Sequence, residues 1–428
     1  MLQTLRNAWR IEEIRRKILF TLLIILLYRL GNAIPVPYVN IAALQSYFAM
    51  LQNTVLGLLD VMSGGAFSNA TIFALSIQPY INASIIIQLL CIAIPALERM
   101  SKEEGEEGKK KIAAITRYVT VAIGLLQGFG FYMLIKNNGI LLADAQSNIW
   151  AAIVIILTFT SGSALIMWLG EQITEYGIGN GISMILFASI ISRLPSSFVT
   201  SVRNIILGQL QWWVLLLMVL GALAIIVLIV FVNDSERRIP VQYAKRVVGR
   251  KMYGGQSTHL PMKVNMSGVM PIIFAQSIAS VPATIAAFTG KTDGWVSTWF
   301  GTNSIPYAII YFLLIIFFAY FYSTIQFNPV EVANNLKKNG GYIPGFRPGK
   351  PTSEFIHKVL NKITLFGAIY LGIIAVVPIL VAHFSQSAAL TGISLGGTSI
   401  IIVVGVALET VRALEAQMLM RNYKGFLD

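Results

Sequence analysis

The chain of 428 residues carries more apolar side chains than a soluble domain of its size can bury. Hydrophobic residues make up 56% of it and charged residues 12%, whereas about one quarter of an ordinary soluble domain is charged. The composition therefore excludes a soluble domain and predicts an integral membrane protein. The net charge of +13 at pH 7 is what cytoplasmic loops of membrane proteins accumulate, so it is no evidence for a nucleic-acid partner.

Ten apolar runs along the chain are candidates for transmembrane helices, each of which needs about 20 residues to cross a bilayer. The fifth run is the shortest, with 13 residues from Ile182 to Leu194, and it needs the preceding segment 177–181 to complete a crossing. Hydropathy places the ten runs at residues 18–37, 72–96, 119–135, 149–169, 182–194, 212–232, 269–288, 305–325, 363–381 and 399–413.

The distribution of basic residues supports all ten crossings. With ten spans, 27 of the 32 lysines and arginines fall on the side that holds both chain ends. The opposite side receives Lys136, Arg193, Arg203 and Lys291, and Arg29 lies within the first span. The positive-inside rule therefore predicts that both termini are cytoplasmic. Omitting the fifth span would abolish this asymmetry.

The polar segment 195–210 divides the ten runs into two halves of five. Because each half crosses an odd number of times, the second half enters the membrane upside down, which predicts an inverted repeat. Proline interrupts the second run of each half, at Pro79 in the first half and at Pro271 and Pro282 in the second. Broken helices at corresponding positions favour a site between the halves. Prolines are also common in membrane helices, so both interpretations stay open.

The segment 56–71, between the first two runs, fits neither a span nor an ordinary loop. It reads LGLLDVMSGGAFSNAT, with Asp60 as its one charge. It is too short and polar to cross the bilayer, and irregular backbone at membrane depth has to be covered by protein. We expect an amphipathic half-helix packed into the outer mouth of the protein. A plain surface loop is the alternative.

Two segments on the basic side are too long to be simple connectors. Residues 233–267 and 328–362 carry seven and six basic residues, with proline, glycine and aromatic residues among them. Long loops of this kind usually carry function.

The sequence contains no motif for catalysis. The three histidines are scattered, and Cys91 is the only cysteine, which excludes a disulfide framework or a cysteine metal site within one chain. The Gly349-Lys350 pair lacks the spacing of a phosphate-binding loop. We therefore expect no enzyme, no cofactor and no metal site. Carboxylates are also scarce within the spans, which argues against an ion-coupled transporter.

Five segments carry motifs in a fixed order along nearly the whole chain: SGGAFSNATIFALSIQPYINASIIIQLL (63–90), MWLGEQITEYGIGNGIS (167–183), YAKRVVGRKMYGGQSTHLPMKVNMSGVMP (243–271), NPVEVANNLKKNGGYIPGFRPGKPT (328–352) and GGTSIII (396–402). Together they resemble the SecY family, the central subunit of the bacterial protein-conducting channel, or SecYEG translocon.

The resemblance implies an all-α polytopic membrane protein, with ten transmembrane helices in two inverted five-helix halves that form a clamshell around an hourglass pore. The clamshell would open laterally between the second and seventh spans, whose helices Pro79 and Pro271 break. The implied parts are an N-terminal half at 1–194 that includes a plug at 57–70, a hinge loop at 195–210, and a C-terminal half at 211–428 with cytoplasmic loops at 233–267 and 328–362.

The resemblance also implies an aliphatic constriction ring in the pore. Residues 77 and 81, like residues 182 and 186, are spaced to share a helix face. Such positions more often face lipid or a neighbouring helix, and it is the resemblance that favours the pore. A ring of this kind gates by dewetting and offers no site to an ion. Its members would be Ile77, Ile81, Ile182, Leu186, Ile273 and Ile402.

The plug and the docking surface are implied in the same way. Arg347 is the strongest docking candidate, because the sequence IPGFRPG holds it in a proline-braced turn. The other docking residues could serve membrane topology alone. The implied plug residues are Gly57, Leu58, Asp60, Met62, Ser63, Gly64 and Gly65, and the residues implied to dock the SecA motor or the ribosome are Arg246, Arg250, Lys251, Arg347 and Lys350.

The expected function is that of a passive, gated channel in the bacterial cytoplasmic membrane. It would export unfolded secretory proteins and release membrane helices sideways into the lipid. The implied partners are the SecE and SecG subunits, the SecA motor ATPase, the ribosome, signal peptides, unfolded preproteins and membrane lipid. An ion-coupled secondary transporter of small solutes and a membrane scaffold are the alternatives.

Overall fold

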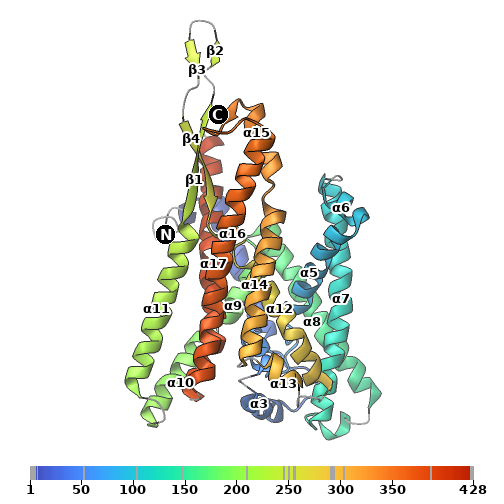
Figure 1. The fold of residues 1–428 in the computed structure, drawn as a ribbon. Helices are drawn as coiled ribbons and strands as arrows, with labels where there is room; N and C mark the ends of the chain where they lie inside the picture. The colour runs from blue at the N-terminus through green and yellow to red at the C-terminus, as the bar shows by residue number, and fades with distance from the viewer. Residues whose placement is uncertain are drawn as a thin grey trace.

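The molecule is a bundle of long helices that run roughly parallel to one axis, with a small β-structure at one end (Figure 1). The computed structural model describes residues 6, 8–51, 54–102, 105–145, 148–208, 211–243, 246–248, 251–253, 257–289, 295–301, 304–385 and 388–424.

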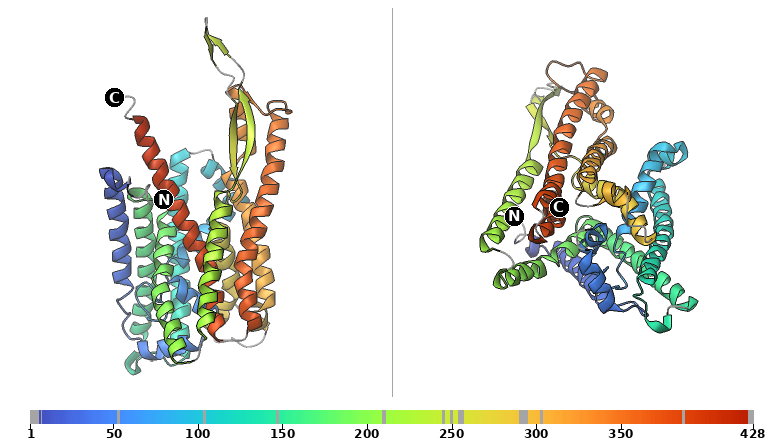
Figure 2. Two further views of the ribbon diagram at one scale, coloured as in Figure 1. Left: turned by 90° about the vertical axis from the view of Figure 1, so that its left-hand side faces the viewer. Right: turned by 60° about the horizontal axis from the view of Figure 1, so that its bottom comes forward.

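Each of the ten predicted runs contains an α-helix, and successive helices alternate in direction (Figures 1 and 2). The helices are α2 (Glu12–Gly31), α5 (Gln78–Ala93), α7 (Gly105–Asn137), α8 (Ile149–Tyr176), α9 (Gly181–Ile191), α11 (Trp212–Asp234), α12 (Met270–Thr289), α14 (Ile305–Gln326), α16 (Lys350–Ser385) and α17 (Ala388–Lys424).

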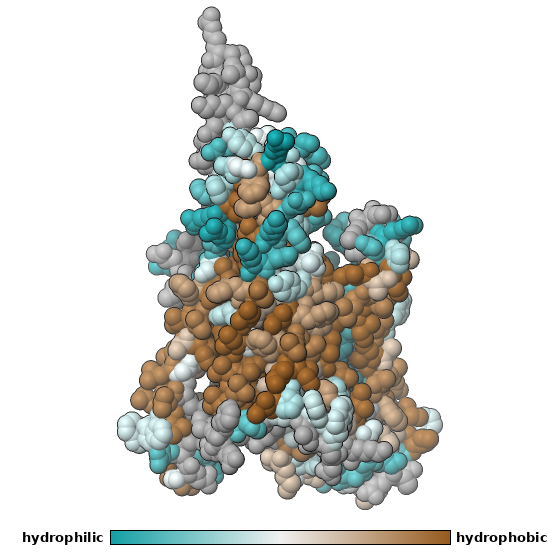
Figure 3. All heavy atoms as spheres, in the orientation of Figure 1, coloured by the Kyte–Doolittle hydropathy of each residue, from teal (hydrophilic) through white to brown (hydrophobic). Residues whose placement is uncertain are grey.

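The exposed middle of the molecule is apolar. On the face shown in Figure 3, hydrophobic side chains form a broad band between two hydrophilic ends. Seven helical segments of the described chain are long and apolar enough to cross a membrane. α2, α5 and α17 are not among them. α2 carries four basic residues between positions 15 and 29, and α5 has only 16 residues.

The second predicted span is shorter than hydropathy indicates. Residues 72–77 form turns, and α5 begins at Gln78 with Pro79 in its first turn. Proline is favourable there, since the backbone N–H that it lacks would have no partner inside the helix. Pro79 therefore starts the helix, and the interruption lies before it rather than at it.

The connector between the two halves is helical rather than a loop. Residues predicted at 195–210 fall largely in α10 (Leu194–Ile206), which follows α9 after a break at Ser192 and Arg193. Pro195 occupies the first turn of α10, where its fixed φ suits a helix start. The polar composition that suggests a loop is instead that of a largely exposed helix.

The two long basic segments form a folded projection. Strands β1 (Glu236–Tyr243), β4 (Ser257–Lys263) and β5 (Gly341–Tyr342) make an antiparallel sheet in the order β4-β1-β5. Its hydrophobic core includes Ile239 of β1 and Ile356 of α16. The remaining elements at this end of the molecule are the hairpin of β2 (Arg246–Val248) and β3 (Lys251–Tyr253), α15 (Pro329–Lys338) and α6 (Pro95–Lys102).

Short elements cover the opposite end. They are α3 (Ile41–Met50), α10 and α13 (Trp295–Phe300), together with the 3-10 helix at Ala143–Ala145. One further short helix, α4 (Val55–Met62), packs inside the bundle against α9, α12 and α17. These three helices come from both halves of the chain, so α4 lies where the halves meet.

Candidate functional site

The six predicted ring residues meet in one apolar cluster at the junction of the halves. Ile182 is partly buried and packs against this cluster. The other five are 1–3% exposed and belong to it: Ile77, Ile81, Leu186, Ile273 and Ile402. They are supplied by α5 and α9 of the first half and by α12 and α17 of the second. The structure therefore brings the predicted residues together, while their service as a pore ring stays a prediction.

Ile77 joins the cluster, but it does not lie within a helix as its spacing from Ile81 predicts. Ile77 is the residue that caps α5, not a residue within the helix. It follows Ser76, whose φ of 51° lies in the left-handed region that side chains rarely adopt. The turn at Ser76 redirects the chain into α5, so Ile77 and Ile81 converge through a bend as well as through helical spacing.

The short fifth span is held in place by a cap and by a close helix contact. The Asn180 side chain accepts hydrogen bonds from the backbone N–H groups of Ile182 and Ser183, at 3.1 and 3.4 Å, which starts α9. A Cβ at Gly181 would lie 1.9 Å from the carbonyl oxygen of Gly170 on α8. The glycine at 181 thus lets α9 pack directly on α8 and orients Ile182 and Leu186.

The predicted half-helix is present as α4, and its last residue belongs to the cluster. Met62 is 2% exposed and belongs to the same apolar cluster as the ring residues. Its sulfur accepts hydrogen bonds from the Nε2 atoms of Gln78, at 3.4 Å, and Gln276, at 3.5 Å. Gln78 lies in the first half and Gln276 in the second, so Met62 touches both. The alternative of a plain surface loop is wrong.

The glycines of the predicted plug have a geometric role as well as the mobility that their sequence suggests. Gly64 and Gly65 have φ of 70° and 87°, values that favour glycine. A Cβ at Gly64 would lie 3.0 Å from the Ser189 carbonyl oxygen, and one at Gly65 would lie 3.3 Å from the Arg193 guanidinium. Gly57 is also buried, and nothing is described of the Leu58 side chain.

Polar groups that the sequence did not single out surround the plug. Arg193 forms an ion pair with Asp60, and the Tyr28 hydroxyl contacts the Ser63 carbonyl at 3.4 Å and the Ser189 hydroxyl at 2.7 Å. The sequence offered one indication of a role for Arg193, because it is a basic residue on the side that is poor in positive charge. Gln276, another omission, is an amide within an otherwise apolar run.

The helices of the predicted lateral gate are in contact in this structure. α5 and α7 of the first half both pack against α12 of the second. On α7, Gly130 lies so close to α12 that a Cβ there would sit 2.2 Å from the Phe288 ring. Pro271 is the second residue of α12, and Pro282 lies inside the helix, so only Pro282 interrupts a helix that has already formed.

Arg347 lies in the tight turn that its sequence predicts. Its side chain is exposed, and its carbonyl accepts a hydrogen bond from the Thr352 hydroxyl at 2.8 Å. The neighbouring Phe346 ring stacks on Phe355, with centroids 4.2 Å apart. Lys350 is also exposed and begins α16.

Two of the other predicted docking residues lie in the hairpin at the far end of the β projection. Arg246 and Lys251 begin β2 and β3, and nothing is described of their side chains. Arg250 lies outside the described residues. The structure therefore places Arg347 and Lys350 on the exposed surface and gives the backbone positions of two further candidates.

The root of the β projection is fastened to the last helix. Arg412 of α17 donates hydrogen bonds to the Asn233 carbonyl at 2.7 Å and to the Asp234 carboxylate at 2.6 Å. Lys263 lies nearby at the end of β4, and burial, reinforced by the positive charge of Arg412, lowers the pKa of its ammonium group. Because α17 also carries Ile402, a rigid helix joins the projection to the apolar cluster.

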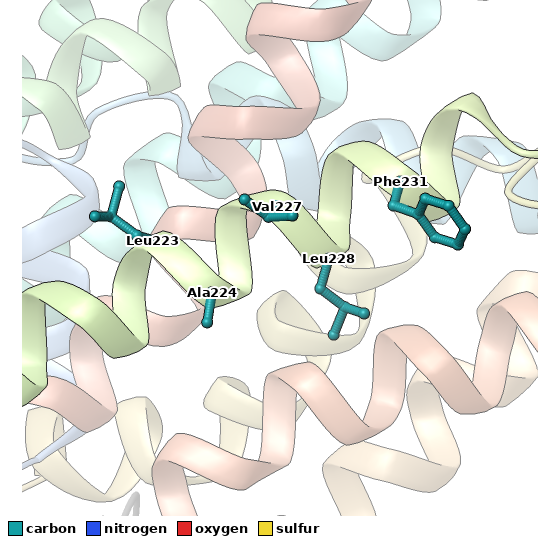
Figure 4. Close-up of a pocket in the computed structure, with 5 residues that line it drawn as sticks. All are labelled: Leu223, Ala224, Val227, Leu228 and Phe231. Carbon is teal, nitrogen blue, oxygen red and sulfur yellow. The ribbon is translucent and has the colours of Figure 1, made fainter.

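No second kind of site is visible among the described residues. They hold no group of three or more His, Cys, Asp or Glu side chains that could bind a metal. An apolar groove runs along α11, where Leu223, Ala224, Val227, Leu228 and Phe231 point outward from a single helix (Figure 4). A groove of this kind suits lipid rather than a polar solute.

The fold and site define a polytopic helical membrane protein whose two halves meet at an apolar cluster, against which the short helix α4 packs. A sequence model of the SecY family matches residues 71–411. The protein translocase subunit SecY of Streptomyces scabiei is 44% identical over 443 residues, which cover 100% of both chains. The chain therefore belongs to the SecY family, and both the resemblance and the predicted fold class are confirmed.

Solved structures agree with this fold at much lower sequence identity. A protein-conducting channel superposes with a TM-score of 0.66 at 17% identity, over 94% of this chain and 92% of the other. A SecY channel whose plug domain stabilises the closed state gives a TM-score of 0.65 at 16% identity, with the same coverage. Canine Sec61 in a ribosome-channel complex gives 0.63 at 16% identity, also with this coverage.

Proposed function

We propose that this SecY-family chain is a passive, gated protein-conducting channel of the bacterial cytoplasmic membrane, with both termini cytoplasmic. It exports unfolded secretory proteins and inserts membrane helices laterally into the lipid. Residues 1–194 and 211–428 act as its two halves, with residues 195–210, mostly α10, as the hinge. Energy comes from a partner, because we identify no nucleotide-binding motif in the sequence.

The observation that carries this proposal is the apolar cluster between the halves, closed by Met62. Aliphatic side chains neither donate nor accept hydrogen bonds, so the constriction excludes water and ions without selecting a polypeptide by its sequence. The cluster is shared by helices of both halves. Separating the halves would open it, and withdrawing α4 would unblock it.

Lateral release is supported by the seam along α12. The seam joins α5 and α7 of one half to α12 of the other, and at Gly130 and Phe288 it is a van der Waals contact. Such a contact parts more readily than a network of hydrogen bonds or ion pairs would. A hydrophobic segment in the pore can then leave into lipid.

The proposed partners follow from the chemistry of each surface. The basic projection, on which Arg347 and Lys350 are exposed, suits the SecA motor and the phosphates of ribosomal RNA. The structure of canine Sec61 in a ribosome-channel complex supports the second assignment. The exposed apolar helices suit membrane lipid and the small subunits SecE and SecG. Signal peptides and unfolded preproteins enter the pore.

The decisive experiment is site-specific crosslinking of a stalled preprotein in reconstituted vesicles. A photoreactive residue at Ile77, Ile81, Ile273 or Ile402 should label the preprotein, whereas one at the exposed α11 positions Leu223 or Val227 should label lipid. Labelling of lipid alone from the cluster positions would overturn the channel. A saturable flux of a small solute would instead favour an ion-coupled transporter.

A further inference from the structure

Asp60 places a carboxylate inside the plug. It is 5% exposed, and a buried carboxylate is stable only when it is paired and hydrogen-bonded. One oxygen accepts a hydrogen bond from the backbone N–H of Ser68 at 2.8 Å, and the other meets the guanidinium of Arg193. Asp60 therefore joins the two arms of the plug to each other and to Arg193.

Arg193 lies in the short break between α9 and α10. It follows α9 and is the N-cap residue of α10, the helix that connects the two halves. Its guanidinium passes beside Gly65, where a Cβ would lie 3.3 Å away. The glycine thus leaves room for the arginine, and the plug and the connector fit together as a pair.

The contacts of the plug are unequal between the two halves. The first half holds it through Arg193, through the Tyr28 hydroxyl on the Ser63 carbonyl, and through Gln78. From the second half, the polar contact within the described residues is that of Gln276 with the Met62 sulfur, a weak acceptor. The remaining contact with the second half is apolar packing in the cluster.

We propose that Arg193 is the positioning residue of the plug: its ion pair with Asp60 holds the plug over the constriction and binds it to the first half. This inference rests on the proposed function of the channel. When the halves part, the weak contacts with α12 and α17 are lost while the ion pair persists. The plug then stays tethered beside the connector and reseals the pore once the polypeptide has passed.

The test is the ion conductance of the resting channel, reconstituted with its partner subunits. Asp60→Asn and Arg193→Gln should each raise the resting conductance about tenfold, and the double variant should leak no more than either single variant, because both remove the same interaction. Arg193→Lys, which keeps the charge, should restore most of the seal. Arg203→Gln on the exposed face of α10 is the matched control and should not leak.

Deletion of residues 57–70 separates failure of this inference from failure of the plug itself. If the deletion leaks while Asp60→Asn and Arg193→Gln remain tight, the plug stands and the ion pair does not position it. Leaks that multiply in the double variant would also overturn the inference, since they would show independent effects. If the deletion itself is tight, the plug and the inference both fail. Monodisperse, heat-stable assembly of each variant establishes that a leak does not come from unfolding.

Discussion

At the scale of single residues, the apolar cluster consists of buried side chains, whereas the predicted docking turn presents an exposed charge on a fixed backbone. Ile273 and Ile402 are buried in the apolar cluster, where their shape determines the packing. Arg347 is exposed, but its backbone is fixed by the Thr352 hydroxyl and by the stacking of Phe346 on Phe355. A backbone fixed in this way loses little further freedom when a partner binds the exposed charge.

Reversal of the charge at Arg347 should therefore block docking specifically. We expect Arg347→Glu to slow SecA-driven export by about tenfold or more, the effect of losing about 1.4 kcal/mol of binding free energy. Membrane insertion of the chain should be unchanged. The measurement is preprotein uptake into inverted vesicles, with Lys358→Glu, also an exposed change on α16, as control. Normal export by the Arg347 variant would disprove the assignment.

At the scale of the elements, small residues determine how closely helices approach. Gly181 brings α9 onto α8, and Gly130 brings α7 onto α12 at the proposed gate. A larger side chain at Gly130 would have to displace Phe288, and overpacking of this kind destabilises a closely packed contact. The closed gate should depend on this glycine.

Substitution at the gate tests that dependence. Gly130→Leu should force α7 and α12 apart and raise the resting ion conductance, and Phe288→Ala in the same chain should reduce the leak by removing the obstructing ring. Gly221→Leu is the control, because a Cβ at Gly221 on α11 meets open space. Equal leakage with and without Phe288→Ala would show that this contact does not seal the gate.

At the scale of the whole molecule, apolar, polar and basic residues gather in separate regions. An apolar band lies between polar ends on the face shown in Figure 3, and the basic segments gather in the projection at one end. The projection is joined through Arg412 to α17, the helix that carries Ile402. The projection and the apolar cluster are thus connected through one helix.

Ribosome binding by the intact channel should weaken steeply with salt. If the five basic docking residues each contact one phosphate, raising the salt from about 50 to about 200 mM should lower the affinity by about two to three orders of magnitude. Cosedimentation of reconstituted vesicles with empty ribosomes measures this. A salt-independent affinity would indicate a largely apolar interface, and Arg347→Glu should reduce the slope if that residue is one of the contacts.

The features that depend on local composition and periodicity could be predicted without the structure. Apolar runs of membrane length located the helices, the basic residues favoured ten crossings over nine, and the prolines and glycines around Arg347 predicted its turn. The amphipathic character of residues 56–71 also predicted α4 correctly. These are properties of neighbouring residues, which a sequence displays directly.

The tertiary structure alone decided the contacts between distant segments. Asp60 and Arg193 are 133 residues apart, and Met62 and Gln276 are 214 apart, so no periodicity connects them. The break at residues 72–77 and the helical connector were also missed, because hydropathy registers whether a segment is apolar or polar, not whether its backbone is helical. Packing between the halves selects those contacts and conformations, and the apolar cluster at their junction is its result.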